Sequence, residues 1–238
     1  MEMKNSFVLP EESDLADLTR YLERALKLDN SGAVRFRAYG QVLAVYVAPI
    51  TSDDVLERMS TVLGLRTLEL SESAEFDITI SITDALKSLK AEGSLEDFSL
   101  VKRLNKVEAK PNTVVLEAEL VDVAWAKLAP TRTGWELGGT FEQQILTDAA
   151  RRGVAEITET LPASVGGPIA ARVRAEIWGK AIDYKFPLPM GAAFVAAGLG
   201  FLTEGEIVDW YYSGDWVRLS SMHGHVLTNF AYDYVSLS

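Results

Sequence analysis

Residues 187–227 read PLPMGAAFVAAGLGFLTEGEIVDWYYSGDWVRLSSMHGHVL, and this stretch decides the fold of the C-terminal half. Up to Leu202 it carries no charged residue. It therefore predicts a helix that begins at Pro189 and is buried nearly all round. The rest of the stretch predicts a β-hairpin of Glu206–Tyr212 and Trp216–Ser221. We expect this helix to form the buried centre of the C-terminal half.

The hairpin and the residues just after it carry the candidate binding site. Aromatic clusters build ligand pockets and interface hot spots, and they also build ordinary cores. His223 and His225 are the only histidines in the chain, and they lie next to this cluster. The residues that we predict to bind a ligand or partner are Trp210, Tyr212, Trp216, His223 and His225.

Two other chemistries are conceivable at the same place. His223 and His225 would share a strand face and could reach one metal ion, with Asp209 or Asp233 adding a carboxylate. A catalytic zinc needs three protein ligands, and the spacing provides only the two histidines, so we predict neither a metal nor another cofactor. Ser220 lies near His223 but in no Gly-x-Ser-x-Gly turn, so no catalytic residue is identified.

In the N-terminal half, apolar and polar residues alternate as in antiparallel strands, and apolar residues at helical spacing lie before and after them. This pattern predicts an antiparallel sheet with flanking helices. Apolar spacing predicts a helix over Pro10–Leu28 and a second over Asp84–Ala91, with Ser81 or Thr83 as its cap. Between them, glycine at Tyr39-Gly40 predicts the turn of a hairpin. The strands expected there are Ala33–Tyr39, Val42–Ala48, Val62–Leu70 and Glu75–Ile82, with a short helix over 52–59 and an edge strand over Thr113–Asp122.

Two further helices are expected ahead of the buried one. Thr140 and Gln143 match a capping box, and the following helix ends before Pro162. Its predicted inner stripe is Phe141, Ile145, Ala149, Val154, Ile157 and Leu161. Gly166-Gly167-Pro168 opens the next helix, whose predicted stripe is Ile169, Val173 and Ile177.

The predicted fold is α+β, in two domains over residues 1–122 and 123–238. The first is a helix–meander–helix layer sandwich, and the second is a three-helix segment closed by the aromatic hairpin. The order of three helices and a hairpin is compatible with a winged-helix-like shape, although helix topology by itself indicates no function.

Composition excludes several classes of function. The net charge is −11, from 23 Lys+Arg and 34 Asp+Glu, so the chain lacks the positive field on which nucleic-acid binding depends. The cluster Lys102, Arg103, Lys106 and Lys110 is best interpreted as a solvated edge. There is no cysteine, which fits a reducing cytoplasm, and neither a signal peptide nor a membrane span is expected.

Three stretches resemble conserved proteins of the high-GC Gram-positive (actinobacterial) type: ALKLDNSGAVRFRAYGQVLAVYVAPI, TVLGLRTLEL and WVRLSSMHGHVL. The resemblance covers most of the chain. It implies a cytoplasmic bacterial protein, and it carries no activity and no catalytic residue with it.

Taken together, these patterns favour a soluble, non-catalytic module that binds a protein or small-molecule partner. A homodimer through the aromatic hairpin or the small-residue helix is compatible with them. Two alternatives remain open at this point. One is a winged-helix transcriptional regulator, and the other is a hydrolase that uses His223 or His225.

Overall fold

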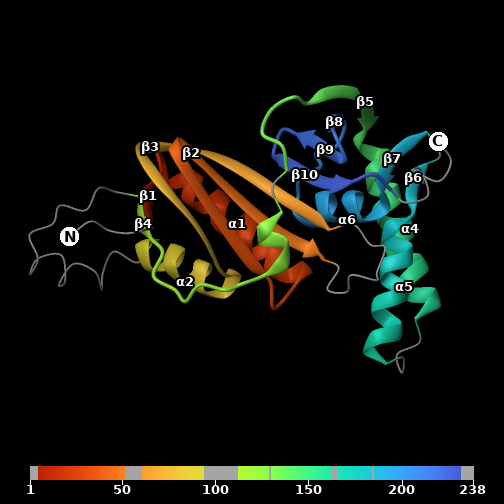
Figure 1. Cartoon of the computed structure of the whole chain (residues 1–238), viewed down its shortest axis with the longest axis horizontal. Helices are drawn as coiled ribbons and strands as arrows, with labels where there is room; N and C mark the ends of the chain where they lie inside the picture. The colour runs from red at the N-terminus through yellow and green to blue at the C-terminus, as the bar shows by residue number, and fades with distance from the viewer. Residues whose placement is uncertain are drawn as a thin grey trace, which may run out of the picture. The chain divides into compact units, whose positions relative to one another are not determined.

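The computed structural model describes residues 5–51, 61–93, 112–128, 130–161, 166–183 and 185–231. The chain forms an α+β fold, as predicted, and divides into two compact units (Figure 1). Unit 1 holds Met1–Val47 and Arg66–Ala126, and unit 2 holds Ala48–Leu65 and Lys127–Ser238. The predicted helix over 52–59, the basic cluster at 102–110 and Asp233 lie outside the described residues.

Unit 1 begins with the helix that the apolar spacing predicted. This helix, α1 (Glu12–Leu28), starts with a capping box in which the Glu11 backbone N–H donates to the Asp14 carboxylate at 3.1 Å. Its buried face is made by Leu15, Leu18, Tyr21, Leu22 and Ala25. The buried Tyr21 hydroxyl donates to the Val45 carbonyl at 3.3 Å, which ties the helix to the neighbouring strand.

The four predicted strands of unit 1 are in fact two long ones. β2 (Ala33–Ile50) and β3 (Val62–Ser81) are hydrogen-bonded neighbours, so the predicted hairpin turn at Tyr39-Gly40 is wrong. Gly40 does have a positive φ of 61°, but β2 is continuous across it. In the middle of β3, residues 71–75 contain no glycine or proline, and the strand continues through them with mostly exposed side chains.

Short elements complete unit 1. β1 (Ser6–Val8) pairs antiparallel with β4 (Thr113–Val115), which ends well before the predicted Asp122. α2 (Ile82–Gly93) confirms the second helix, and the Ser81 hydroxyl accepts the Asp84 N–H at 3.0 Å. A 3-10 helix, η1 (Ala124–Lys127), follows β4. Phe7 of β1 stacks on rings from both long strands, Phe36 at 6.2 Å and Phe76 at 6.4 Å.

The strands of unit 2 include the predicted aromatic hairpin, β8 (Ile207–Ser213) and β9 (Trp216–Ser221). The hairpin lies inside a sheet of order β2-β3-β10-β9-β8-β5, with β5 (Glu136–Glu142) at the edge and β10 (Gly224–Asn229) beside β9. A winged helix ends in a free two-stranded wing. Here β5 pairs with β8 on the outer side, so the predicted closing hairpin is an interior part of a larger sheet.

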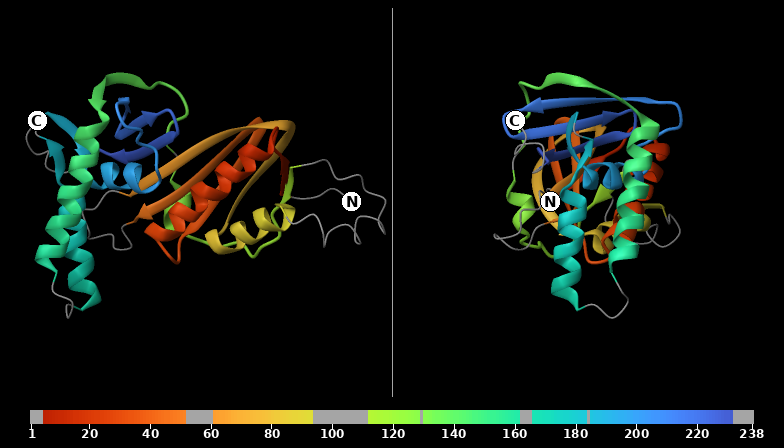
Figure 2. Two further views of the ribbon diagram at one scale, coloured as in Figure 1. Left: turned by 180° about the vertical axis from the view of Figure 1, so that it is seen from behind. Right: turned by 90° about the vertical axis from the view of Figure 1, so that its right-hand side faces the viewer.

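The helices of unit 2 are α4 (Gln143–Thr160), α5 (Gly167–Gly179) and α6 (Met190–Gly198). A small hairpin of β6 (Ala181–Asp183) and β7 (Phe186–Pro189) precedes α6. As predicted, α6 starts after Pro189 and is largely buried. It packs against α4, α5 and β10, and α4 and α5 lie side by side (Figure 2).

The predicted details of α4 and α5 need correction. Thr140 belongs to β5 rather than to a helix cap, and α4 begins at Gln143. The buried face of α4 is Leu146, Ala149, Ala150 and Gly153, whereas Ile145 and Val154 are exposed. In α5 the buried end is Ile177 and Trp178, and Ile169 is exposed. Packing against Trp178 selects a smaller-residue face than apolar periodicity suggests.

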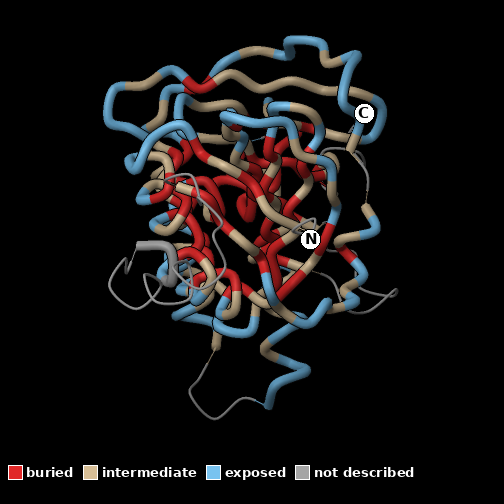
Figure 3. The backbone as a smooth tube through the Cα atoms, turned by 90° about the vertical axis from the view of Figure 1, so that its left-hand side faces the viewer, coloured by how far each residue is buried: buried red, intermediate tan, exposed pale blue. Residues whose placement is uncertain are grey.

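Buried, intermediate and exposed residues follow one another along the strands and helices of both units (Figure 3). No described helix is both long enough and apolar enough to cross a membrane.

Candidate functional site

The sheet of unit 2 has two chemically different faces. In the β8–β9 register Trp210 lies opposite Leu219, and Tyr211 lies opposite Arg218. Because successive strand residues point to opposite faces, Trp210 shares a face with the buried Leu219, and Tyr211 shares the other with Arg218. The first is the core face. The second contains half-buried polar and aromatic side chains and is the candidate site.

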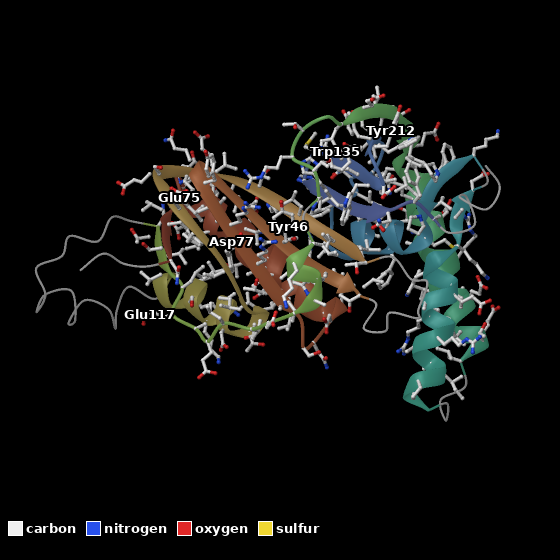
Figure 4. All side chains as sticks on the ribbon, in the orientation of Figure 1. Tyr46, Glu75, Asp77, Glu117, Trp135 and Tyr212 are labelled. Carbon is white, nitrogen blue, oxygen red and sulfur yellow. The ribbon has the colours of Figure 1, made fainter. Side chains whose placement is uncertain are left out.

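Arg218 is the centre of this second face. Its guanidinium carbon lies 4.6 Å from the centre of the Trp135 ring and 4.7 Å from that of Tyr211, so two aromatic rings hold the cation. Trp135 comes from the segment before β5 (Figure 4), and its indole N–H donates to the Thr131 carbonyl at 3.0 Å. The pairing of β5 with β8 brings Trp135 to the hairpin.

Two exposed apolar side chains lie on the same face of the sheet as this cation. Leu137 of β5 pairs with Tyr211 and is 60% exposed, and Ile207 at the start of β8 is 58% exposed. Large apolar side chains with that much exposure beside half-buried aromatics are typical of contact surfaces. We call this set the arginine–aromatic face: Trp135, Leu137, Ile207, Tyr211 and Arg218.

The charge of Arg218 is not neutralised by the residues that the structure describes. None of the described carboxylates lies within 4.0 Å of it, and its Nε atom is buried without a hydrogen-bond partner. Burial lowers the pKa of the Arg218 guanidinium, and the nearby Tyr211 acts in the opposite direction. An arginine nevertheless stays protonated in a protein, so this is a half-buried cation without a described counter-ion.

His225 lies on the same face, two strands away from Tyr211. Its Nδ1 is 3.0 Å from the Ser220 hydroxyl, with which it pairs across β9 and β10. Burial lowers the pKa of His225, and the positive charge of Arg218 lowers it further. The imidazole is therefore neutral near pH 7.

A hydrolytic triad would need a carboxylate on the other imidazole nitrogen and donors for an oxyanion. Asp209, the acid opposite Ser220 on β8, instead accepts the Tyr211 hydroxyl at 3.2 Å. The only hydrogen bond that the described residues give the His225 imidazole is the one between its Nδ1 and the Ser220 hydroxyl. The Ser220–His225 pair thus has the contact of a nucleophile and base without the partners that would orient and use it.

The structure separates the five residues that the sequence singled out. Trp210 and Tyr212 lie on the core face, with ring centres 6.1 Å apart. Trp210 covers the Gly138-Gly139 pair of β5, where a Cβ on Gly138 would come within 2.2 Å of its ring. The Tyr212 hydroxyl donates to Glu136 at 2.8 Å, and this contact raises the pKa of Tyr212 (Figure 4 shows this residue).

The other three lie on or beside the second face. Trp216 is two residues from Arg218 on β9, so its side chain points to the same face of the sheet. His225 of β10 pairs with Ser220 of β9, which is also two residues from Arg218, and so it lies on this face too. His223 is exposed in the turn between β9 and β10, where its backbone N–H donates to Ser221 Oγ at 3.3 Å. The two histidines therefore do not alternate on one strand. No group of three or more His, Asp or Glu side chains that could hold a metal ion occurs within the described part of the chain.

Sequence reasoning missed Arg218, Trp135 and Tyr211 as a unit. Part of the signal was present, because Arg218 is the only lysine or arginine after Lys185. The predicted connection of the hairpin, Ser213-Gly214-Asp215, is one residue longer than the turn in the structure, where Ser213 pairs with Trp216 and Tyr211 therefore lies opposite Arg218. Trp135 had no such signal, since it is brought to the site by the pairing of β5 with β8.

The fold is similar to that of bacterial DNA polymerase III beta subunits. The structure of that subunit from Borrelia burgdorferi, in complex with a natural product, matches with a TM-score of 0.51 at 11% identity, over 100% of this chain and 68% of that one. The subunit from Pseudomonas aeruginosa gives 0.47 at 12%, over 98% and 68%. A putative beta subunit from Eubacterium rectale gives 0.47 at 6%, over 94% and 64%.

At these identities the likeness is one of fold alone, and it is greatest in the Borrelia burgdorferi structure among the three described. The likeness corrects the winged-helix-like shape to a sliding-clamp-like one. No curated protein matches this chain.

Two family models cover nearly the whole chain. The model described as Domain of unknown function (DUF8185) matches residues 130–231, which contain the arginine–aromatic face. The model described as Domain of unknown function (DUF8010) matches residues 3–127. That second match covers more than half of the 238 residues, and the chain therefore belongs to the DUF8010 family.

Proposed function

We propose that this protein is a non-catalytic protein-interaction module and that the arginine–aromatic face is its contact surface. The observation that carries the proposal is the cation of Arg218, held between Trp135 and Tyr211. Tryptophan, tyrosine and arginine are the residues most enriched among interface hot spots, which lie at the centre of contact surfaces.

The borders of the face support the same function. Leu137 and Ile207 offer exposed apolar area on the same face as the cation, and a partner that covered them would remove that area from water. The rings are already fixed by hydrogen bonds of Trp135 to Thr131 and of Tyr211 to Asp209, so binding would cost less side-chain entropy.

The clamp-like fold adds an analogy. The Borrelia burgdorferi protein is a polymerase subunit, and a subunit acts within an assembly. By analogy of fold, this chain would also act by holding another protein.

Site-specific crosslinking in the cell of origin tests the proposal. Photoreactive p-benzoylphenylalanine would replace Leu137 on the face, or Ile169 on α5 as a control of nearly equal exposure (60% and 63%). We expect a discrete crosslinked species from position 137 that is absent from position 169 and lost when Tyr211→Ala is added. A second copy of this chain as the crosslinked protein would identify a homodimer through the same face.

Two results would refute the proposal. One is the absence of any discrete species from position 137, and the other is equal products from both positions. Circular dichroism of each variant confirms that loss of a product does not come from unfolding.

A further inference from the structure

Arg218 has no ion-pair partner among the residues that the structure describes. Residues 186–238 contain no other lysine or arginine, while Glu204, Glu206 and Asp215 lie in the same stretch. Despite this acidic setting, none of the described carboxylates forms an ion pair with Arg218. Asp209, on the same face, accepts the Tyr211 hydroxyl instead.

The aromatic contacts also constrain the guanidinium. The guanidinium carbon lies 4.6 Å from the centre of the Trp135 ring and 4.7 Å from that of Tyr211, so the two rings limit the positions that the group can take. Nε is buried without a partner, so the edge formed by the two terminal nitrogens is the one that a ligand can reach. Two parallel N–H donors in one plane match the two oxygens of a carboxylate.

We infer that Arg218 is the recognition residue of this face and that it takes a carboxylate side chain, aspartate or glutamate, from the partner protein. This inference rests on the proposed interaction function. The carboxylate would give Arg218 the counter-ion that the described residues do not supply. The exposed Leu137 and Ile207 would then contact apolar residues that flank the acid.

The pKa of His225 reports whether a carboxylate has bound to Arg218. Because the charge of Arg218 contributes to the lowered pKa of His225, a carboxylate bound to Arg218 should raise that pKa. The other ionisable side chains that the register places on this face of β5, β8 and β9 are Glu142, Asp209 and Tyr211, and the last two are hydrogen-bonded to each other.

The test uses the full-length, ¹⁵N-labelled protein and two small probes. N-acetyl-glutamate N′-methylamide carries one carboxylate, and N-acetyl-glutamine N′-methylamide is its neutral isostere. We expect the glutamate probe to shift the Arg218 Nε–H resonance saturably, with Kd on the order of 10 mM, and to raise the pKa of His225. The glutamine probe should bind at least about tenfold more weakly.

Three controls distinguish recognition of the carboxylate by the Arg218 guanidinium from a general effect of charge or ionic strength. Arg218→Lys keeps the charge but loses the planar fork, so the glutamate response should weaken several-fold. Arg151→Gln removes an equal charge from the exposed surface of α4 and should leave the response unchanged. Sodium chloride at matched ionic strength should not reproduce the shift, because chloride screens charge but cannot accept two parallel N–H donors as a carboxylate does.

Equal responses to both probes, or to sodium chloride, would overturn the inference, as would an undiminished response in Arg218→Lys. The crosslinking experiment distinguishes a failure of carboxylate recognition from a failure of the proposed interaction function. If the product from position 137 persists in Arg218→Gln but disappears in Tyr211→Ala, the contact surface stands and carboxylate recognition falls.

Discussion

At the scale of single residues, Arg218 and His225 share one face of the sheet and act on each other electrostatically. Burial is the main cause of the lowered pKa of His225, and the Arg218 charge is the second. The chain has only two histidines, so each imidazole can be followed separately by NMR.

Removal of the Arg218 charge should raise the pKa of His225. In Arg218→Gln the like charge disappears while burial persists, so the pKa should move toward the ordinary value of 6.5 without passing it. A titration of the imidazole protons, assigned with His223→Gln, measures the change. Arg151→Gln is the matched control and should leave the pKa of His225 as it is in the parent protein. An unchanged pKa in Arg218→Gln would show that the two groups do not interact.

His225 should also make the protein less stable in mild acid. Its folded-state pKa is below 6.5, so the unfolded chain binds the proton first as the pH falls. The free energy of unfolding should therefore decrease as the pH falls through 6.5, and this contribution should level off below the folded-state pKa. Urea unfolding between about pH 8 and about pH 5 measures it. His225→Gln should lose this component and His223→Gln should retain it; identical slopes in all three proteins would contradict the assignment.

At the scale of elements, glycine and tryptophan set the packing of the helices in unit 2. Gly153 on the buried face of α4 meets Trp178 of α5, whose ring stacks on Phe194 of α6 at 4.5 Å. A Cβ on Gly153 would lie 2.2 Å from the Trp178 ring, closer than van der Waals contact allows. The absence of a side chain at position 153 is therefore what lets α4 and α5 approach.

Substitution Gly153→Ala should destabilise the protein despite the higher helix propensity of alanine. Overpacking costs about 1–3 kcal/mol and the gain in propensity is about 1 kcal/mol, so we expect a net loss of about 1–2 kcal/mol. The midpoint of urea unfolding measures it. Gly167→Ala, in α5 with open space around the added Cβ, is the control and should cause no loss. Equal midpoints for the two variants would show that the Trp178 contact does not limit the packing.

At the scale of the whole molecule, the net charge is a better indication of the class of partner than the fold is. The net charge is −11, and several exposed basic residues on the helices are paired with acids, as in Arg20–Asp17 and Lys87–Asp84, each at 2.7 Å. Such surfaces repel a phosphate backbone at low salt. A clamp-like fold therefore does not by itself imply contact with nucleic acid.

We accordingly expect no salt-dependent binding to duplex DNA. Fluorescence anisotropy of a labelled duplex, with the protein titrated at low ionic strength, should stay flat. A basic DNA-binding protein under the same buffer serves as the positive control. Binding that weakens steeply with added salt would contradict this expectation and return attention to the winged-helix regulator hypothesis.

Local patterns predicted much of this fold. The spacing of Leu15, Leu18 and Leu22 predicted α1, and the uncharged run after Pro189 predicted the buried α6. The aromatic alternation and the glycine at the turn predicted β8 and β9, with Gly214 at a positive φ of 56°. These elements depend on neighbours within a few residues, so the sequence carries the information directly.

Patterns misled where a distant contact outweighed the local one. Gly40 looked like a hairpin turn, but the pairing of β2 with β3 continues through it. Apolar periodicity predicted that Ile145 and Val154 lie on the buried face of α4. In the structure both are exposed, and packing against Trp178 buries Gly153 instead. In both cases the deciding partner lies elsewhere in the chain.

The sequence by itself determined the α+β class, the helices α1, α2 and α6, the aromatic hairpin and the acidic surface. Only the tertiary structure decided that Trp210 and Tyr212 belong to the core face and that Trp135 joins Tyr211 around Arg218. The physical reason is strand pairing. A one-residue change in register moves every side chain to the other face, and the register of β5 on β8 is set by contacts between residues about seventy positions apart.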